Sequence, residues 1–224
     1  EGSIGFCGIY LIELEDAGVV RLVLVDPGHA GRRKALLGAL ARLGLEPTAI
    51  DVVVLTHAHW DHVQNVDLFP KAQVLIHEAE LAEIEGSQAR DHVTAGWTRL
   101  VLDTAHLLAV SEGYSVGPGV SIVHLPGHTG GSIGLLVEVD DLVHVLTGDA
   151  IPSAMALADR RPRASTPDLR ALESIDRVGS LADVVWPGHD APFRVVGGRP
   201  AGYLDEPGPL VLRAPAGAIR VVSG

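Results

Sequence analysis

Short apolar runs alternate with polar turns that contain glycine or proline along most of the chain. Runs of about four to eight β-branched and other apolar residues are typical of buried strands, whereas leucines spaced three and four positions apart indicate an amphipathic helix. Leu36, Leu40 and Leu43 have that helical spacing. The pattern predicts strands over residues 9–14, 21–25, 52–55 and 73–76 and in the runs GYSV, VSIVHL, SIGLLVEV and LVHVLTG, and helices over residues 34–43, 78–85 and 167–178.

These elements fall into two sets, which predicts a layered α/β domain. Turns at EDAG, at PGHTGG and at the two aspartates after Val139 join neighbouring strands into hairpins. Each set of strands is followed by helices, so we expect two sheets or one folded sheet. A length of 224 residues without a polar low-complexity linker predicts a single domain over residues 1–224. The tail after residue 190 contains β-prone runs such as LVL and IRVV, but its pattern gives no assignment.

The segment 93–108 leaves two interpretations open. Its apolar residues recur at helical spacing and would form one stripe on a helix. The stripe consists of Val93, Trp97, Leu100, Val101, Thr104, Leu107 and Leu108. It is either the face of a helix that packs on the core, or part of the wall of an apolar substrate pocket.

Composition narrows the class of protein. Hydrophobic residues make up 47% of the chain and charged residues 20%, which predicts a packed core and excludes a disordered chain. The net charge of −11 makes nucleic acid an unfavourable partner. Cys7 is the only cysteine, so no intrachain disulfide is possible, and we expect a reducing cytoplasmic location.

The sequence also bears on targeting. No apolar window is long enough for a membrane span, and no basic segment followed by an apolar run predicts a signal peptide. The chain begins at Glu1, and Met155 is its only methionine, so residues before Glu1 are expected to be missing. A cleaved export signal stays an alternative to the cytoplasmic location.

The stretch THAHWDH crowds three histidines and an aspartate into the connection after the predicted strand 52–55. His57 and His59 alternate around one alanine and can point to the same side. Asp61 and His62 are adjacent and must point in different directions, which suits two metal ions better than one. The cluster therefore has the pattern of half of a binuclear site.

Three further candidates follow predicted strands in the same way. His128 lies in PGHTGG, Asp149 follows LVHVLTG, and His189 lies in PGH after DVVW. Each alone could be an ordinary hydrogen-bonded loop residue, but together they predict side chains that meet at one edge of a sheet. Imidazole and carboxylate without thiolate favour zinc, with iron or manganese as alternatives, and seven ligands on two ions leave positions open for water.

The motifs HAHWDH, PGHTGGS, TGDA and PGHD resemble the HxHxDH, H, D and H motifs of the metallo-β-lactamase superfamily. The resemblance implies a four-layer αββα sandwich, with two mixed sheets between outer helices and an active site along one edge. It also implies the ligand sets. One ion is held by His57, His59 and His128, the other by Asp61, His62 and His189, and Asp149 bridges both.

Other polar residues receive weaker predictions. We expect His124 and His144 to be buried with a hydrogen bond, and His77, His92 and His106 to be ordinary helix or loop residues. His29, in DPGH, could lie near the site. Asp26, in the VDPG turn, is expected to orient a ligand histidine.

The resemblance implies hydrolysis by a hydroxide shared between two divalent ions, with Asp61 as a further proton carrier. Compact N-acyl homoserine lactonases keep all seven ligands, so a lactone or related ester is the first expectation for a small-molecule substrate. Glyoxalase II resembles the chain at THAHWDH and PGHTGGS, but it carries a helical glutathione-binding extension after the last metal histidine. The 35 residues after His189 are irregular and β-prone here, which disfavours thioester hydrolysis.

Two further functions stay open. The stretch ADVVWPGHDAPFRVV is similar to the corresponding part of metallo-β-lactamase domain-containing protein 1, from a branch associated with RNA cleavage, and Arg160, Arg161 and Arg163 form a local basic cluster. The chain would then be a phosphodiesterase or ribonuclease. A binding or regulatory protein with a degenerate site is the third possibility, and the intact ligand set disfavours it.

Overall fold

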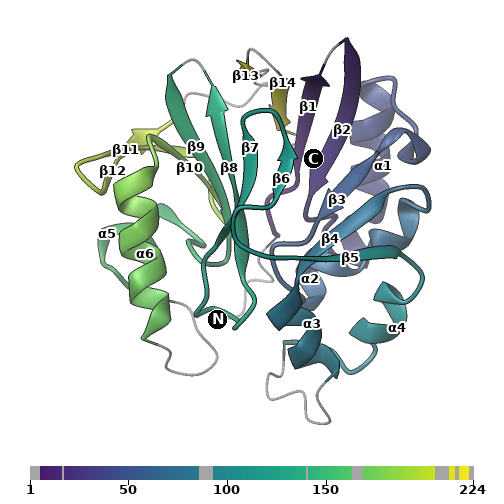
Figure 1. Ribbon diagram of the computed structural model, residues 1–224, viewed down its shortest axis with the longest axis horizontal. Coiled ribbons are helices and arrows are strands. Elements are labelled where there is room, and N and C mark those ends of the chain that lie inside the picture. Colours follow the sequence, from purple (N-terminus) through teal and green to yellow (C-terminus); the bar gives the residue numbers. More distant parts are fainter. Residues whose placement is uncertain are drawn as a thin grey trace.

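The computed structural model describes residues 6–16, 18–85, 93–139, 141–162, 169–204, 212–214 and 217–221. Within these residues two seven-stranded sheets face each other at the centre of the molecule (Figure 1). The first sheet has the order β13 (Leu212–Ala214), β14 (Gly217–Val221), β1 (Tyr10–Asp16), β2 (Val19–Val25), β3 (Val52–Val54), β4 (Gln73–His77) and β5 (His106–Val110). The second has the order β12 (Arg199–Tyr203), β11 (Phe193–Val196), β10 (Val184–Pro187), β9 (Leu142–Gly148), β8 (Ile133–Val139), β7 (Val120–His124) and β6 (Ser115–Gly117).

Both sheets are mixed. Strands β2 to β5 pair in parallel, and the strands on the other side of β2 pair antiparallel. In the second sheet β9 and β10 are parallel, and the remaining pairs are antiparallel. Parallel neighbours place their carboxyl ends, and the loops that follow them, at the same end of a sheet.

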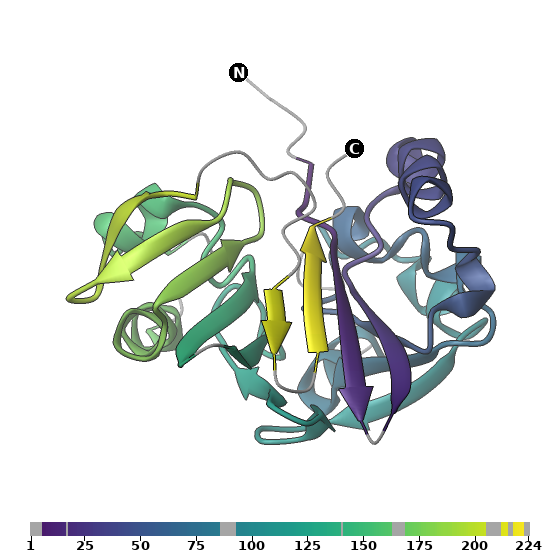
Figure 2. The same cartoon turned by 90° about the horizontal axis from the view of Figure 1, so that it is seen from above.

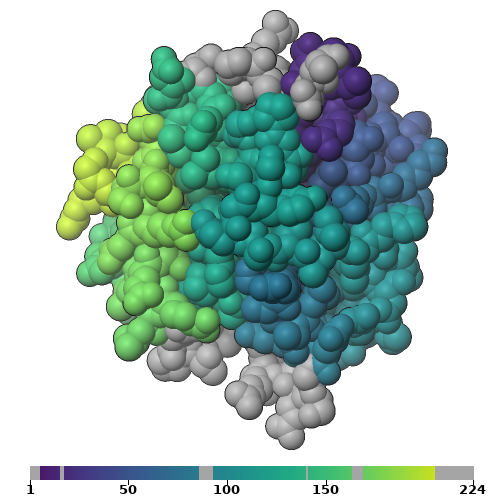
Figure 3. Space-filling view, viewed as in Figure 1, coloured from purple at the N-terminus to yellow at the C-terminus, as the bar shows by residue number. Residues whose placement is uncertain are grey.

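Helices cover the outer face of each sheet (Figure 1). The first sheet is accompanied by α1 (Arg33–Arg42), α2 (Trp60–Val63), α3 (Glu78–Glu85) and α4 (Thr98–Leu102), and the second by α5 (Ala154–Ala158) and α6 (Arg170–Leu181). Three short 3₁₀ turns, η1 (Ala30–Arg32), η2 (Pro47–Ala49) and η3 (Val66–Leu68), lie in connections next to these helices. In the space-filling view the teal segment that contains β5 to β7 lies across the front between the two halves (Figure 3).

Three apolar clusters separate the four layers, and alternate residues of one strand belong to different clusters. On β2, Val23 and Val25 lie in the cluster between the sheets, whereas Leu22 and Leu24 pack with Leu36 of α1. A strand with both faces buried is apolar at every position, which explains the continuous apolar runs in the sequence.

The second sheet shows the same division. Leu146 of β9 lies between the sheets, and its neighbour Val145 packs against Ile175 and Val178 of α6. The predicted αββα sandwich with two mixed sheets is therefore confirmed.

The prediction of one helix over 93–108 is wrong. Only the short helix α4 forms there, and residues 106–110 form β5, which pairs in parallel with β4. Leu107 and Leu108 pack on opposite faces of the first sheet, so they are core residues and not one wall of a pocket. The helical spacing was misleading because two adjacent apolar residues fit a helix stripe and a strand buried on both faces equally well.

Two other expectations also change. His77 ends β4 and His106 begins β5, so both are strand residues and not helix or loop residues, and His92 lies outside the described residues. The tail that the sequence left unassigned adds strands to both sheets: β11 and β12 extend the second sheet, and β14 pairs with β1 (Figure 2). Among the described residues, no helix combines the length and apolar character that crossing a bilayer requires.

Candidate metal centre

Loops from both sheets meet at one end of the sandwich. The loop after β3, with the first turn of α2, comes from the first sheet, and the loops after β7, β9 and β10 come from the second. These loops carry the seven predicted side chains, His57, His59, Asp61, His62, His128, Asp149 and His189. The expectation that they meet at the edge of a single sheet is wrong, because the site requires the two sheets to be stacked.

The seven side chains form three overlapping groups. In each group the potential ligand atoms lie within 4.8 Å of one another. The groups are His57, His59 and His128; His57, His62 and Asp149; and Asp61, His62 and His189. The first and third, called here the first and second ligand groups, contain the same residues that the resemblance assigns to the two ions. The structure thus brings together all seven predicted residues.

Asp149 lies between the two ligand groups. Its Oδ1 is 3.1 Å from His189 Nε2 and 3.5 Å from His62 Nε2, both in the second group. Its Oδ2 is 3.4 Å from Nε2 of His128, in the first group. One carboxylate therefore faces both groups, as a bridging ligand would.

Asp26 determines which nitrogen of the ligand histidines faces the centre. Its Oδ2 lies 2.8 Å from His62 Nδ1 and accepts the hydroxyl proton of Thr56 at 2.7 Å. Because that hydroxyl donates to Asp26, it accepts from His57 Nδ1, which lies 3.0 Å away. Both rings then carry their proton on Nδ1, which leaves Nε2 as a lone pair for a cation. The predicted contact between Asp26 and a ligand histidine is present.

Buried lone pairs without a partner fit a cation. His57 Nε2 and His62 Nε2 are buried and have no hydrogen-bond partner among the residues that the structure describes. His128 Nε2 and His59 Nδ1 approach to 3.0 Å. Buried polar atoms normally have partners, so several lone pairs directed at one small region form a donor set suited to a divalent metal ion.

Burial and neighbouring charges shift the pKa values of three groups at the centre in different directions. Burial favours the neutral form of Asp149, but His62 and His189 outweigh it and hold the pKa of this carboxyl well below its usual range. Burial disfavours charge on His62 as well, yet Asp26 and the other anionic groups raise its pKa well above the ordinary value. For His57, burial and the neighbouring histidines lower the pKa. Carboxylates of this kind would equally stabilise a bound cation.

Two glycines allow the loops to approach this closely. A Cβ at Gly188, next to His189, would lie 2.1 Å from Asp149 Oδ1. A Cβ at Gly148 would lie 2.4 Å from the Thr56 hydroxyl, and Gly148 has a φ of +50°, which favours glycine. The turn TGDA therefore needs glycine where the two sheets meet, and the turn PGH needs it where the loops after β9 and β10 meet.

The other histidines that the structure describes lie outside the ligand groups. His144 is buried and accepts a hydrogen bond from Trp186 Nε1, as predicted. His124 is half-buried, and its Nε2 lies 3.1 Å from the Gly130 carbonyl. His29 does not bond a ligand residue. Its ring stacks on Phe6 and meets Trp60, which lies inside the ligand motif, edge-on.

Sequence reasoning missed Glu80. This residue of α3 is 2% exposed and binds the loops on either side of the first ligand group. A signal was available, because Glu80 precedes Ile84 by one helical turn and adjoins Leu81 on the apolar side of α3. An acid in an apolar stripe is expected to be buried with specific partners.

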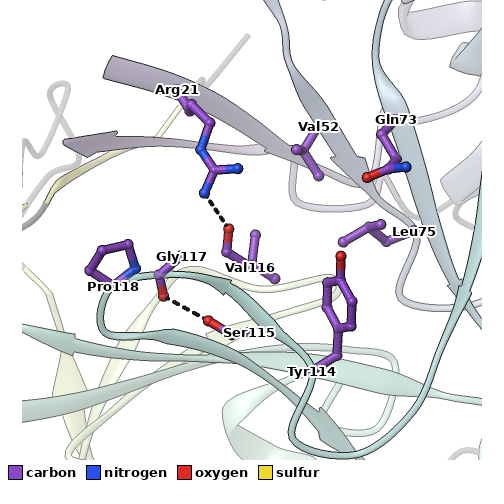
Figure 4. Close-up of a pocket in the computed structure, with 9 residues that line it drawn as sticks. All are labelled: Arg21, Val52, Gln73, Leu75, Tyr114, Ser115, Val116, Gly117 and Pro118. Carbon is purple, nitrogen blue, oxygen red and sulfur yellow. Dashed lines mark hydrogen bonds between the residues drawn. The ribbon is translucent and has the colours of Figure 1, made fainter. Parts of the chain in front are cut away.

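A separate pocket lies at the opposite end of the sandwich (Figure 4). It has a volume of about 420 Å³ and is lined by Arg21, Val52, Gln73, Leu75, Tyr114 and residues 115–118. Val52 and Gln73 lie at the amino ends of β3 and β4, whereas the loops of the metal centre follow the carboxyl ends of their strands. Arg21 donates to the Val116 carbonyl at 2.9 Å. None of the residues that line this pocket is histidine, aspartate or glutamate, so it is distinct from the metal centre.

Comparison with known proteins identifies relatives. The sequence model of the family described as "Metallo-beta-lactamase superfamily" matches residues 4–189. Metallo-beta-lactamase domain-containing protein 1 of Mus musculus is 34% identical over 176 residues, 78% of this chain and 61% of that protein. An N-acyl homoserine lactonase of Bacillus sp is 28% identical over 160 residues, 69% of this chain and 62% of that protein. The chain thus spans only 61% and 62% of the length of these two relatives.

Solved structures share the fold. AidC, a dizinc quorum-quenching lactonase, superposes with a TM-score of 0.71 at 18% sequence identity, over 89% of this chain and 80% of that chain. At this identity the likeness concerns the fold alone.

Proposed function

Since the chain belongs to the metallo-beta-lactamase superfamily, we propose that it is a metal-dependent hydrolase with two divalent cations at the centre. The observation that carries this proposal is the convergence of three ligand groups at one end of the sandwich. In this proposal residues 1–224 act as one domain, because the centre requires loops from both sheets.

The two ligand groups would hold one cation each. His57, His59 and His128 would hold the first, Asp61, His62 and His189 would hold the second, and Asp149 lies between the two groups. Imidazole and carboxylate donors suit zinc, and also iron or manganese. Divalent cations at such a centre supply Lewis acidity and an activated water for attack on a carbonyl or phosphorus.

The chain's own residues decide from which side a substrate approaches. The side chain of His62 is fully buried, whereas those of Asp61, His128 and His189 are 13%, 10% and 12% exposed. Substrate therefore approaches over these three. Asp61 Oδ2 lies 3.5 Å from His189 Nε2, at the open side of the centre. A carboxylate there can carry a proton to a leaving alkoxide.

For the substrate we propose a lactone or related ester, in line with the similarity to N-acyl homoserine lactonases. Phosphodiester cleavage is the second candidate. It rests on the stretch ADVVWPGHDAPFRVV and on the cluster of Arg160, Arg161 and Arg163. Arg160 of that cluster donates to both carboxylate oxygens of Asp176, so its charge is already paired. Arg163 lies outside the described residues. This pairing weakens the case for a nucleic-acid surface.

The experiment compares substrates and metal states. Protein loaded with zinc, iron or manganese is assayed with an acyl homoserine lactone, an aryl ester, a glutathione thioester and a single-stranded oligonucleotide, by acid release and by gel. We expect lactone or ester hydrolysis that chelation abolishes and added metal restores. Activity that survives complete metal removal would contradict a metal-dependent reaction, and cleavage of the oligonucleotide alone would replace the lactone as substrate.

A further inference from the structure

Glu80 joins the two loops that carry the first ligand group. Its Oε1 accepts the backbone N–H of Ala58 at 2.8 Å. Its Oε2 accepts the Thr129 hydroxyl at 2.7 Å and the backbone N–H of Gly131 at 3.1 Å. Ala58 belongs to the loop after β3 of the first sheet, and Thr129 and Gly131 belong to the loop after β7 of the second. One buried carboxyl therefore spans the junction of the sheets.

The contacts of Glu80 flank ligand residues on both sides. Ala58 lies between His57 and His59, and Thr129 directly follows His128. The hydrogen bonds to Ala58 and Thr129 fix backbone or hydroxyl atoms next to a ligand histidine, and none of the three touches an imidazole ring. Glu80 thus adds a side-chain link to the backbone hydrogen bond between Ile133 and Thr56, and it joins the loops of His59 and His128, whose nearest ring nitrogens are 3.0 Å apart.

The partners of Glu80 match a carboxylate and not an amide. Two of the three are backbone N–H groups, which can only donate. The third, the Thr129 hydroxyl, also lies 2.8 Å from the Ser132 hydroxyl, which itself accepts the Thr129 N–H. Ser132 can donate to Thr129, so Thr129 donates to Glu80. A glutamine at this position would set its NH₂ group against one of these donors.

Close packing holds α3 against the loop that Glu80 binds. A Cβ at Gly131 would lie 2.3 Å from the backbone nitrogen of Glu80, a distance that no real Cβ tolerates. The GG pair of PGHTGGS therefore allows the first turn of α3 to lie directly on the His128 loop. The helix and the loop form one unit, which the carboxylate then joins to the loop after β3.

We propose that Glu80 is a positioning residue, which holds the first ligand group at the separation that a cation needs by tying the His128 loop to the loop of His57 and His59. This inference rests on the proposed two-cation centre. Glu80 supports the first ligand group in particular, because none of its hydrogen bonds involves a residue next to His189 or Asp149. Loss of Glu80 should therefore affect the first cation more than the second.

The primary test is a metal titration of Glu80→Gln. Zn²⁺ binding is followed by calorimetry and by competition with a chromogenic chelator, and Co²⁺ binding by its visible spectrum. We expect the wild type to bind two ions and E80Q to bind one of them about 10- to 100-fold more weakly, the usual cost of losing a supporting partner. The matched control is Glu78→Gln, which removes an exposed carboxylate from the same helix turn and should bind both ions as the wild type does.

A milder pair of variants serves if E80Q does not fold. Thr129→Val removes the hydroxyl that donates to Glu80, and Thr129→Ser keeps it. T129V should weaken the same ion by a smaller factor, and T129S should restore it. A purely structural role would lower the midpoint of thermal unfolding while leaving both affinities intact in the folded protein.

The titration separates this inference from the proposed function, because it requires no substrate. If folded E80Q bound each ion as tightly as the wild type does, the positioning role would be overturned. Where E80Q does not fold, wild-type affinities for both ions in T129V would have the same consequence. Selective loss of one ion supports the role even if the protein hydrolyses no lactone or ester. In that case the proposed function fails and the role of Glu80 stands.

Discussion

The two ligand groups are supported by two buried carboxylates in different ways. Asp26 contacts the ring of His62 directly and reaches His57 through Thr56. Glu80 contacts no ligand ring and binds only the backbone and a hydroxyl beside them. Direct contact sets the tautomer and basicity of a ligand, whereas indirect contact sets the distance between ligands.

The two supports also differ in the level of structure on which they depend. Asp26 follows β2, the parallel neighbour of β3, and its backbone N–H donates to the Val54 carbonyl at 3.0 Å. Its position is thus fixed within the first sheet. Glu80 acts across the two sheets. Strand pairing therefore preorganises the support of His62, and packing of the two sheets preorganises the support of the first ligand group.

The largest effect is expected from Asp149→Ala, which removes the carboxylate between the groups and so erases the difference between them. Both ions should bind more weakly, and turnover should fall by more than the about 10- to 100-fold expected for a supporting residue. Metal content after dialysis and kcat/KM measure the two effects. Asp159→Ala, an exposed aspartate on a nearby helix end, is the control. If D149A kept one ion at full affinity, Asp149 would not be shared.

Gly188→Ala should disturb both groups through Asp149. The new Cβ would lie 2.1 Å from Asp149 Oδ1 and 2.8 Å from the Gly148 backbone, so the carboxylate or the loop must move. We expect weaker binding of both ions and a free energy of unfolding lower by about 1–3 kcal/mol, as in other overpacked sites. Gly96→Ala, where a Cβ meets no atom of the described residues within 4 Å, should change neither quantity. Unchanged metal affinity in G188A would show that the loop adapts.

Asp26→Asn sharpens the comparison with Glu80→Gln. The amide removes the charge beside His62 and one acceptor of the Thr56 contacts, so the second ligand group should lose about 10- to 100-fold in affinity, and more than the first. Metal titration of both variants in parallel measures the order of the two losses. Asp67→Asn, which changes an exposed ion pair with Arg33, is the control. If D26N and E80Q weakened binding of the same ion, Asp26 and Glu80 would not support different ligand groups.

The smallest effect is expected from His77, whose contact with His124 also joins the two sheets next to the first ligand group. His77 precedes α3 and stacks on His124, with ring centroids 4.1 Å apart. Burial and the nearby His124 lower the pKa of His77 below its ordinary 6.5. The unfolded chain therefore binds this proton more readily, and the contribution of His77 to stability is complete above pH 6.5 and lost as the pH falls towards the lowered pKa.

His77→Gln should flatten the pH dependence of stability. Urea unfolding at about pH 7.5 and about pH 5.5 gives the difference in the free energy of unfolding, which should be smaller in H77Q than in the wild type. His106→Gln, an exposed histidine of the neighbouring strand, should keep the wild-type difference. An unaltered difference in H77Q would assign the pH dependence to other groups.

Local sequence determined the ligand types and most of the elements. The segment after residues 52–55 contains four of the candidate ligands within six residues. A glycine precedes each of the other three, because tight turns and close approach require it. Apolar runs located the central strands, since strands buried on both faces leave an unbroken apolar signal. The same signal misplaced 106–110, where a helix stripe and such a strand look alike.

The distances between side chains of different sheets depend on how the two sheets stack. His57 and His128 are neighbours because β3 and β7 belong to stacked sheets, and no local pattern records that stacking. In the sequence Glu80 is one of several acidic residues of a predicted helix, and only the packing of α3 shows that it is buried between two loops. Sequence fixes which atoms a residue offers and how its own segment turns, but distances between remote segments arise from the burial of apolar faces summed over the whole fold.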